Sequence, residues 1–256
     1  MMRYELFPEL DGVRTVVTGA GRGMGRGIAY GLARRGASIA VCDIDETLLS
    51  STLGGLDSIA PTCAGFAVDV TDETSVRVGL AGARDALGGI DLLVNNAGVL
   101  SVAPVVELEV REWRRVLEVN ATGVFLVSRE AARVMIEQRS PASIITIASI
   151  AGKVGDPQLA HYSASKFAVV GFSQSLAREL APFDITVNVI CPGLVETEMI
   201  DTMRRALGVS LEQMLQAQLI KRPQTPDEIA TGISFLHRNR SVTGQAINID
   251  GGTVFH

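Results

Sequence analysis

The sequence predicts an α/β fold, a doubly wound parallel sheet with helices on both faces, formed by a single domain over residues 1–256. Two observations carry this prediction. Short β-rich runs alternate with helical patterns along the chain, which is the order that builds a parallel sheet. The runs are also nearly all apolar, as expected for strands that are buried on both faces.

Each expected strand is a run of β-branched and apolar residues bounded by turn or helix signals. The first run comes directly before a glycine-rich turn, and the third is the weakest in pattern. The expected strands are Arg14–Thr18, Ser38–Cys42, Gly65–Val68, Leu92–Val94, Ser143–Ala148, Ile185–Ile190 and Ala246–Ile249.

Helices are expected between these strands, because apolar residues recur there at helical spacing. Thr71 and Asp72 suit the N-cap of one of them. In a doubly wound sheet, ligands bind beyond the carboxyl ends of the strands. The turns that follow the strands are therefore where a site is expected. The expected helices are Ile28–Arg35, Thr71–Leu87, Val110–Gln138 and Tyr162–Leu180.

Composition and charge exclude several classes of protein. Apolar residues make up 47% of the chain and charged residues 20%, which excludes wholesale disorder. The net charge of −5 disfavours nucleic acid or an anionic membrane as a partner. No apolar run approaches the roughly 18 residues that span a bilayer, and the first ten residues carry no stretch typical of a signal peptide. Cys42, Cys63 and Cys191 lie far apart, so we expect neither a disulfide framework nor a zinc site, and a cytoplasmic location.

A glycine-rich turn, TGAGRGMG over residues 18–25, joins the first strand to the first helix. Glycines allow a tight turn and a close approach to a ligand, and a helix N-terminus offers N–H groups to a pyrophosphate. The spacing fits T-G-x-x-x-G-x-G, and a helix-entry turn without a ligand is the alternative. The candidate phosphate-binding residues are Gly19, Gly21, Arg22, Gly23, Met24 and Gly25.

Further short motifs follow in order over almost the whole chain. They are Asp69-Val70, Asn95-Asn96-Ala97-Gly98, Asn120, Ser149, Tyr162-x-x-x-Lys166, Pro192-Gly193 and Asp250-Gly251-Gly252. Together with the glycine turn, their order and spacing resemble the short-chain dehydrogenase/reductase family. The resemblance implies a single Rossmann-like domain, a nicotinamide cofactor and interconversion of an alcohol and a carbonyl compound.

The resemblance also implies which residues bind the cofactor, in two further sets. The residues beside the adenine and its ribose are Asp69, Val70, Asn96, Ala97 and Gly98. The residues of the loop after the sixth strand are Pro192, Gly193, Val195 and Thr197. Of these, Val195 would present backbone groups to the carboxamide and Thr197 would contact the pyrophosphate side. No metal ion is expected, because the chain shows no pattern of ligands for one.

Asp43, at the end of the second strand and 20 residues beyond Gly23, bears on the choice of cofactor. A carboxylate there can accept hydrogen bonds from the adenosine ribose. It would repel the 2′-phosphate of NADP by up to about 4 kcal/mol. Arg22 favours a phosphate, although the family has an arginine here in NAD enzymes too. We therefore expect NAD, with NADP as the alternative, and interpret Asp45 as a solvated loop charge.

Tyr162 and Lys166 stand four residues apart on one helix face. A phenol can give a proton to an alkoxide, or take one from an alcohol, if its pKa falls toward neutrality. A charge about 4 Å away contributes about 1 kcal/mol in water but about 4 kcal/mol in a shielded site. We therefore expect a shielded Lys166 to lower the pKa of Tyr162. The resemblance implies that Tyr162 is the acid/base and that Lys166 also binds the nicotinamide ribose.

Ser149 and Asn120 complete the set that the resemblance marks as catalytic. The Ser149 hydroxyl follows the fifth strand and can hold the substrate oxygen near Tyr162. Asn120 lies inside an expected helix, although Asn is a poor helix former. The resemblance implies that its backbone carbonyl binds a water that links Lys166 to solvent. His161 points about 100° away from Tyr162 on the helix, and we interpret it as a helix-entry residue.

Residues 198–220 are expected to form a lid over the substrate. Met199, Met203 and Met214 fall in this stretch and suit varied apolar surfaces. The stretch mixes apolar and charged residues, so a small hydroxy compound, a polyol, a steroid and an acyl thioester all remain open. The long helices carry apolar residues such as Phe125 and Phe167. Because such helices pair between subunits in the family, we expect a homotetramer, or at least a dimer.

The expected function is hydride transfer between NAD(H) and a secondary alcohol or ketone. One alternative is an NADPH-dependent reductase of a 3-oxoacyl thioester on an acyl carrier protein. We interpret Arg111, Arg114 and Arg115 as a solvated helix face, and in this alternative they would be the docking patch for the carrier protein. Asp43 argues against the cofactor of such a reductase. The other alternative is a nucleotide-binding regulator without catalysis, which the complete set of catalytic residues disfavours.

Overall fold

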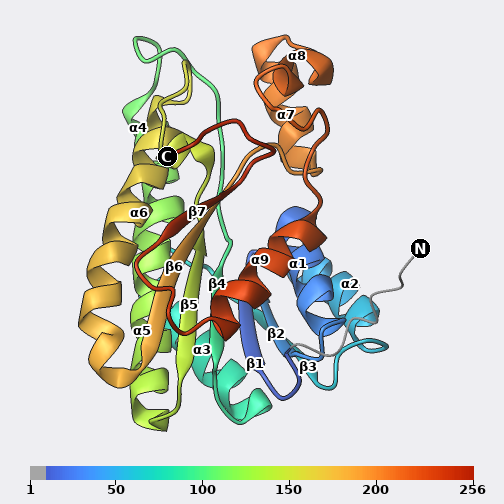
Figure 1. The fold of residues 1–256 in the computed structure, drawn as a ribbon, viewed down its shortest axis with the longest axis vertical. Helices are drawn as coiled ribbons and strands as arrows, with labels where there is room; N and C mark the ends of the chain where they lie inside the picture. The colour runs from blue at the N-terminus through green and yellow to red at the C-terminus, as the bar shows by residue number, and fades with distance from the viewer. Residues whose placement is uncertain (1–9) are drawn as a thin grey trace.

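A seven-stranded parallel sheet lies at the centre of the computed structural model, which describes residues 10–256. Its strands run in the order β3-β2-β1-β4-β5-β6-β7, and helices cover both faces (Figure 1). The predicted doubly wound α/β fold is confirmed. The expectation about a signal peptide concerns the first ten residues. Of these, residues 1–9 lie outside the part of the chain that the structure describes.

The strands agree with the expected runs to within two residues at each end. All residues of β4, β5 and β6 are buried, because helices pack against both faces of the sheet. The strands are β1 Arg14–Thr18, β2 Ser38–Asp43, β3 Cys63–Ala67, β4 Leu92–Asn95, β5 Ala142–Ile147, β6 Ile185–Pro192 and β7 Ala246–Ile249.

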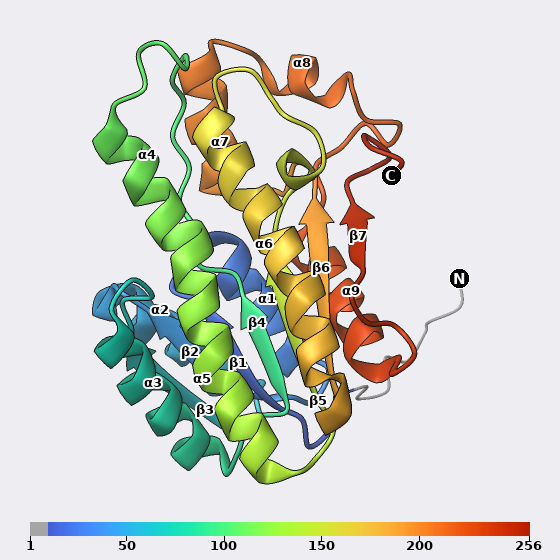
Figure 2. The same ribbon diagram turned by 90° about the vertical axis from the view of Figure 1, so that its left-hand side faces the viewer.

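Two apolar cores lie on the two faces of the sheet. On one face α1, α2 and α9 pack against the strands, and on the other face α3, α5 and α6 do so (Figure 2). Within residues 10–256, no helix is both long and apolar enough to cross a membrane. The helices are α1 Gly23–Ala33, α2 Glu46–Leu56, α3 Glu73–Leu87, α4 Val110–Leu117, α5 Gly123–Gln138, α6 Ala160–Leu180, α7 Glu198–Leu207, α8 Leu211–Leu215 and α9 Pro226–Arg238.

The helices α2 and α9 were not expected from the sequence, and α7 and α8 lie in the stretch that was expected only as a lid. Asp45 caps α2, since its carboxylate accepts a hydrogen bond from the backbone N–H of Leu48 at 3.0 Å. Asp45 is exposed and lies outside the helix, as expected of a solvated loop charge, and it is in addition the N-cap of α2. A capping box formed by Thr225 and Glu228 starts α9. That Thr-x-x-Glu pattern is visible in the sequence and predicts a helix start.

The helix expected over Val110–Gln138 is interrupted. A π-helical turn, η1 Glu118–Thr122, separates α4 from α5 and contains Asn120. Such turns occur mostly as single insertions in longer helices, frequently at functional sites. The first helix also begins earlier than expected, at Gly23, so that the glycine turn leads directly into it.

Candidate active site

The candidate site lies at the carboxyl edge of the sheet, between β1 and β4. β1 pairs with β2 on one side and with β4 on the other, so the strand order reverses here. Connections leave the two strands toward opposite faces, and a crevice opens between them. The turns after the strands, which the sequence marked as candidate positions, meet at this edge.

The glycine turn after β1 packs tightly against the loop after β4. The amide of Asn96 donates to the backbone carbonyls of Thr18 and Gly19, each at 3.0 Å. The Thr18 hydroxyl accepts from the backbone N–H groups of Asn96 and Ala97 at 3.1 and 3.2 Å. Gly19 has a φ of +61°, and a Cβ atom there would lie 2.7 Å from the Cα atom of Ala97. Only glycine fits this position.

The start of α1 has the features of a phosphate site. Among residues 10–256, no side chain caps its first turn, and that turn carries no acidic residue. Gly23 has a φ of +53°. A Cβ atom built on Gly23 would lie 3.9 Å from the side chain of Thr197, in the loop after β6. A Cβ atom on Gly25 would collide with the carbonyl oxygen of Gly19. The backbone N–H groups and the missing side chains fit a pyrophosphate. Met24, by contrast, packs against the apolar core.

Asp43 lies beside this turn. One of its carboxylate oxygens accepts from the backbone N–H of Gly21 at 2.8 Å, and the other accepts from that of Asp45 at 3.1 Å. The Arg22 guanidinium is exposed and pairs with Glu198, the first residue of α7, at 3.2 Å. The Asp43 carboxylate therefore lies against the backbone of the turn, whereas the Arg22 side chain is paired with α7.

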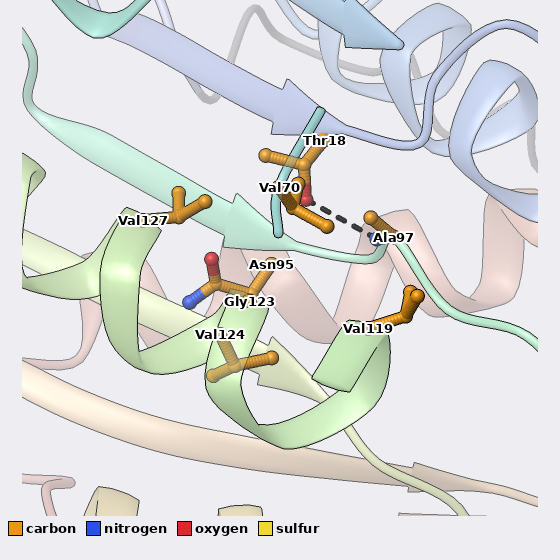
Figure 3. A pocket seen from close by; sticks show the side chains of 8 residues that line it. All are labelled: Thr18, Val70, Asn95, Ala97, Val119, Gly123, Val124 and Val127. Carbon is orange, nitrogen blue, oxygen red and sulfur yellow. Dashed lines mark hydrogen bonds between the residues drawn. The ribbon is translucent and has the colours of Figure 1, made fainter. Parts of the chain in front are cut away.

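Asp69 and Val70 are used in local packing. The Asp69 carboxylate accepts from the backbone N–H and the hydroxyl of Thr71 at 2.9 and 2.7 Å. Val70 packs against Gly123 at the start of α5. A small hollow extends from there to the end of β4 (Figure 3), and it is lined by Thr18, Val70, Asn95, Ala97, Val119, Gly123, Val124 and Val127. The lining is mostly apolar and does not include Tyr162. The hollow therefore lies beside the crevice and is not the reaction centre.

The loop after β6 closes the crevice from the opposite side. Pro192 ends β6, and the backbone N–H of Gly193 donates to the carbonyl of Ile249 at 3.1 Å. Val195 is buried and forms a bridge with Gln224. The Thr197 hydroxyl donates to the carbonyl of Val195 at 3.1 Å, which leaves the Thr197 methyl group facing Gly23.

Ser149, Tyr162 and Lys166 meet at the ends of β5 and α6. Tyr162 and Lys166 are only 8% and 5% exposed. The Lys166 ammonium lies 5.6 Å from the centre of the Tyr162 ring and donates to the carbonyl of Ile147 at 3.0 Å. Tyr162 is hydrogen-bonded to the side chain of Ser149. The predicted shielding from water is present.

The pKa of Tyr162 does not follow the prediction. Burial raises the pKa of the phenol to about 12, and the hydrogen bond with Ser149, which acts in the opposite direction, does not offset it. Burial also lowers the pKa of Lys166 to about 8. The lowering of the pKa of Tyr162 that was expected from a shielded Lys166 is not found here, because the shielding that strengthens the attraction also penalises both charged forms.

Asn120 links the loop after β4 to α6. Its side chain exchanges two hydrogen bonds with the backbone of Val99, at 2.8 and 2.9 Å, and donates to the hydroxyl of Ser165 at 3.0 Å. The Ser165 hydroxyl in turn donates to the carbonyl of Tyr162 at 2.7 Å. Ser165 was not singled out from the sequence, although a serine three residues beyond a helical carbonyl can make this bond. Gly98 completes the group, since its side faces Asn120 and Lys166.

Comparison with known proteins identifies the family. A family model for short chain dehydrogenases matches residues 14–208. The chain belongs to the short-chain dehydrogenase/reductase family. Its members are oxidoreductases, and dependence on NAD(P) is general among them. This short-chain dehydrogenase is therefore an enzyme with a Rossmann fold.

Relatives of known name span nearly the whole chain. A 3-oxoacyl-[acyl-carrier-protein] reductase FabG of Vibrio cholerae is 35% identical over 95% of this chain and 98% of its own. An L-2,3-butanediol dehydrogenase of Corynebacterium glutamicum is 35% identical over 94% and 98%. The crystal structure of a short-chain type dehydrogenase/reductase from Mycobacterium marinum has a TM-score of 0.91 and 32% identity, covering 98% of both chains.

Gly25→Ala tests the phosphate-binding turn of this short-chain dehydrogenase. The added methyl group displaces the Gly19 carbonyl, so we expect binding of NADH to weaken at least about tenfold, measured by fluorescence titration. Gly54→Ala is the control, because Gly54 is exposed in α2 with no atom near its side. It should leave binding unchanged and stabilise the fold by about 0.5–1 kcal/mol. Wild-type affinity in Gly25→Ala would contradict the assignment.

Proposed function

We propose that this enzyme transfers a hydride between NAD(H) and a secondary alcohol or its ketone, with Tyr162 as the acid/base. One observation carries the proposal: the Tyr162 phenol, the Ser149 hydroxyl and the Lys166 ammonium converge in a buried site at the carboxyl edge of the sheet. A proton donor, a hydrogen-bonding anchor and a cation are what carbonyl reduction needs.

Tyr162 moves the proton in this mechanism. In reduction, a hydride arrives at the carbonyl carbon, the C=O double bond becomes a C–O⁻ single bond, and the Tyr162 hydroxyl gives its proton to that oxygen. In oxidation, the tyrosinate takes the proton from the alcohol. NAD⁺, when bound, supplies the hydride acceptor and a positive charge. The Ser149 hydroxyl hydrogen-bonds the substrate oxygen and keeps it within reach of the phenol.

Lys166 stabilises the tyrosinate and binds the nicotinamide ribose. The ammonium lies beside the phenol ring and is held by the Ile147 carbonyl. In a site with a low effective dielectric, a charge at this separation acts strongly on the proton equilibrium. Asn120 supports the relay, because its side chain binds the backbone of Val99 on one side and the Ser165 hydroxyl of α6 on the other. Its carbonyl, in the π-helical turn, is the proposed contact for the water that links Lys166 to solvent.

Tyr162→Phe tests this assignment. Removing the hydroxyl removes the proton donor, and general acid–base catalysis contributes about 10²–10⁴-fold to rates. We therefore expect kcat to fall by at least about a hundredfold, measured at nicotinamide absorbance, while the Kd for NADH changes less than about threefold. Near-normal turnover in Tyr162→Phe would exclude Tyr162 as the acid/base.

The proposed preference for NAD rests on the charges beside the turn. The Asp43 carboxylate lies against Gly21 and is placed to accept hydrogen bonds from the ribose hydroxyls. A 2′-phosphate at the same position would meet that carboxylate. Arg22, the candidate phosphate partner, is paired with Glu198. Both observations favour NAD over NADP.

Asp43→Asn should shift the preference toward NADP. The amide removes the negative charge but keeps an oxygen that can accept from Gly21, so the turn stays in place. Because two charges about 4 Å apart interact by up to about 4 kcal/mol in a shielded site, we expect the ratio of kcat/KM for NAD to that for NADP to fall at least tenfold. An unchanged ratio would count against Asp43 as the selector.

A carrier-protein reductase is the second candidate, and the FabG relatives favour it. Such a reductase usually takes NADPH, which Asp43 disfavours. The proposed docking patch is also partly neutralised. Arg115 pairs with Glu112 at 2.6 Å, and Arg111 lies 3.8 Å from Glu109. A non-catalytic regulator is the third candidate, and nucleotide binding without turnover on any substrate would support it.

The proposed lid, residues 198–220, comprises α7 and α8. Met203 of α7 packs toward a cluster that surrounds Tyr162. Leu100 and Val102 of the loop after β4, and Ala151 and Leu159 of the loop after β5, complete this cluster. The walls nearest the phenol are thus apolar, which favours a substrate with apolar substituents on its carbonyl carbon. A panel of alcohols and ketones, each with NAD(H) and NADP(H), tests substrate and cofactor together.

We also propose that the enzyme is a cytoplasmic homotetramer, or at least a dimer. Phe125 and Phe167 are 41% and 47% exposed on α5 and α6, and Phe125 packs edge-on against Phe172. Exposed aromatic side chains on neighbouring helices favour contact with a second copy. Sedimentation at micromolar concentration should give a tetramer or dimer, and a monomer would refute this.

A further inference from the structure

His161, the residue before Tyr162, is fully buried and is not used in the mechanism proposed above. Its Nε2 atom lies 2.7 Å from the hydroxyl oxygen of Ser101, in the loop after β4. Its Nδ1 atom is buried and has no hydrogen-bond partner in the part of the chain that the structure describes. The imidazole is therefore anchored at one point only, through Ser101.

Glu112 of α4 lies near this pair, and its negative charge acts to raise the pKa of His161. Arg115 holds the Glu112 carboxylate with two hydrogen bonds, at 2.9 and 2.6 Å. These bonds lower the pKa of Glu112 to about 2. A neutral imidazole has one donor and one acceptor nitrogen, and the bond to the Ser101 hydroxyl runs through Nε2 in either tautomer. Burial lowers the pKa of His161, in agreement with a neutral imidazole.

The hydrogen bond between Ser101 and His161 joins two segments of the structure. Ser101 belongs to the loop after β4, and His161 belongs to the first turn of α6. α4 packs against α6 beneath that loop (Figure 2). Leu100 and Val102, the two neighbours of Ser101, belong to the apolar cluster around Tyr162. The network therefore lies directly behind the wall that faces the phenol.

We propose that the hydrogen-bonded Ser101–His161 network positions Leu100 and Val102 against Tyr162 and so determines how tightly the carbonyl substrate is held. Ser101 and His161 are positioning residues, which act through the apolar wall and touch neither substrate nor cofactor. This inference rests on the proposed function of Tyr162. The glycine turn and Asp43 make no hydrogen bond to Ser101 or His161 within residues 10–256, so we expect binding of the adenosine and pyrophosphate parts of the cofactor to change little.

Ser101→Ala removes the bridging hydroxyl in a loop, where the fold tolerates the change. Without this hydroxyl, the His161 imidazole no longer holds the loop that carries Leu100 and Val102. We therefore expect KM for the ketone to rise about tenfold. KM for NADH and kcat should change less than about twofold. His161→Leu, which has a similar volume and no donor, should raise KM for the ketone by a similar factor.

Conservative and control variants separate positioning from general destabilisation. His161→Gln retains a donor that can reach Ser101, and should restore KM for the ketone to within about twofold of wild type. If the two residues act through one hydrogen bond, the double variant Ser101→Ala/His161→Leu should be no worse than either single variant. Ser173→Ala is the control, because it removes a buried hydroxyl of α6 that has no partner within the described chain, and it should leave KM unchanged.

Hydrogen exchange supplies a readout that does not depend on turnover. In Ser101→Ala, amides of residues 99–103 should exchange about tenfold faster than in wild type, and they should not do so in Ser173→Ala. Unchanged exchange, an unchanged KM for the ketone, or an equal rise in KM for NADH would each overturn the proposal. A wild-type protein that binds NADH but turns over no ketone would instead overturn the proposed function, and the exchange measurement would still decide on the network.

Discussion

Exclusion of water from Tyr162 and Lys166 is the constraint on which the candidate site depends. Burial penalises the charged form of each group, so the phenol holds its proton more firmly and the ammonium less firmly than in water. The same burial makes any further charge in the crevice act strongly. The chain by itself keeps the phenol protonated, and a cation that enters the crevice can shift that balance.

The loop after β4 connects the parts of the site. Asn96 fixes the glycine turn on one side of this loop, and Asn120 fixes the turn of α6 that carries Tyr162 on the other. Asn96 binds backbone carbonyls of the glycine turn, whereas Asn120 binds the backbone of Val99 and reaches α6 through the Ser165 hydroxyl. Strands and helices supply rigid positions, and these amide contacts set the spacing between the phosphate-binding turn and the reaction centre.

Much of the fold could be predicted because its signals are local. Every strand was found from an apolar run, and β7 agrees at both ends. α2 was missed because its serines and paired glycines are poor helix formers, and tertiary packing stabilises it. The π-helical turn at Asn120 could not be predicted from the sequence. Asn120 in this turn hydrogen-bonds to the backbone of Val99, which belongs to another segment, and no local pattern of residues indicates such a contact.

The sequence by itself determined the strand–helix order, the glycine turn and the family to which the chain belongs, because these depend on spacing along the chain and on the residue types present. Only the tertiary structure decided the direction in which the pKa of Tyr162 moves, the partner of Arg22 and the hydrogen bonds of His161. These depend on burial and on segments that meet in space. Desolvation and the choice of a hydrogen-bond partner are properties of a packed environment, which no local pattern of residues contains.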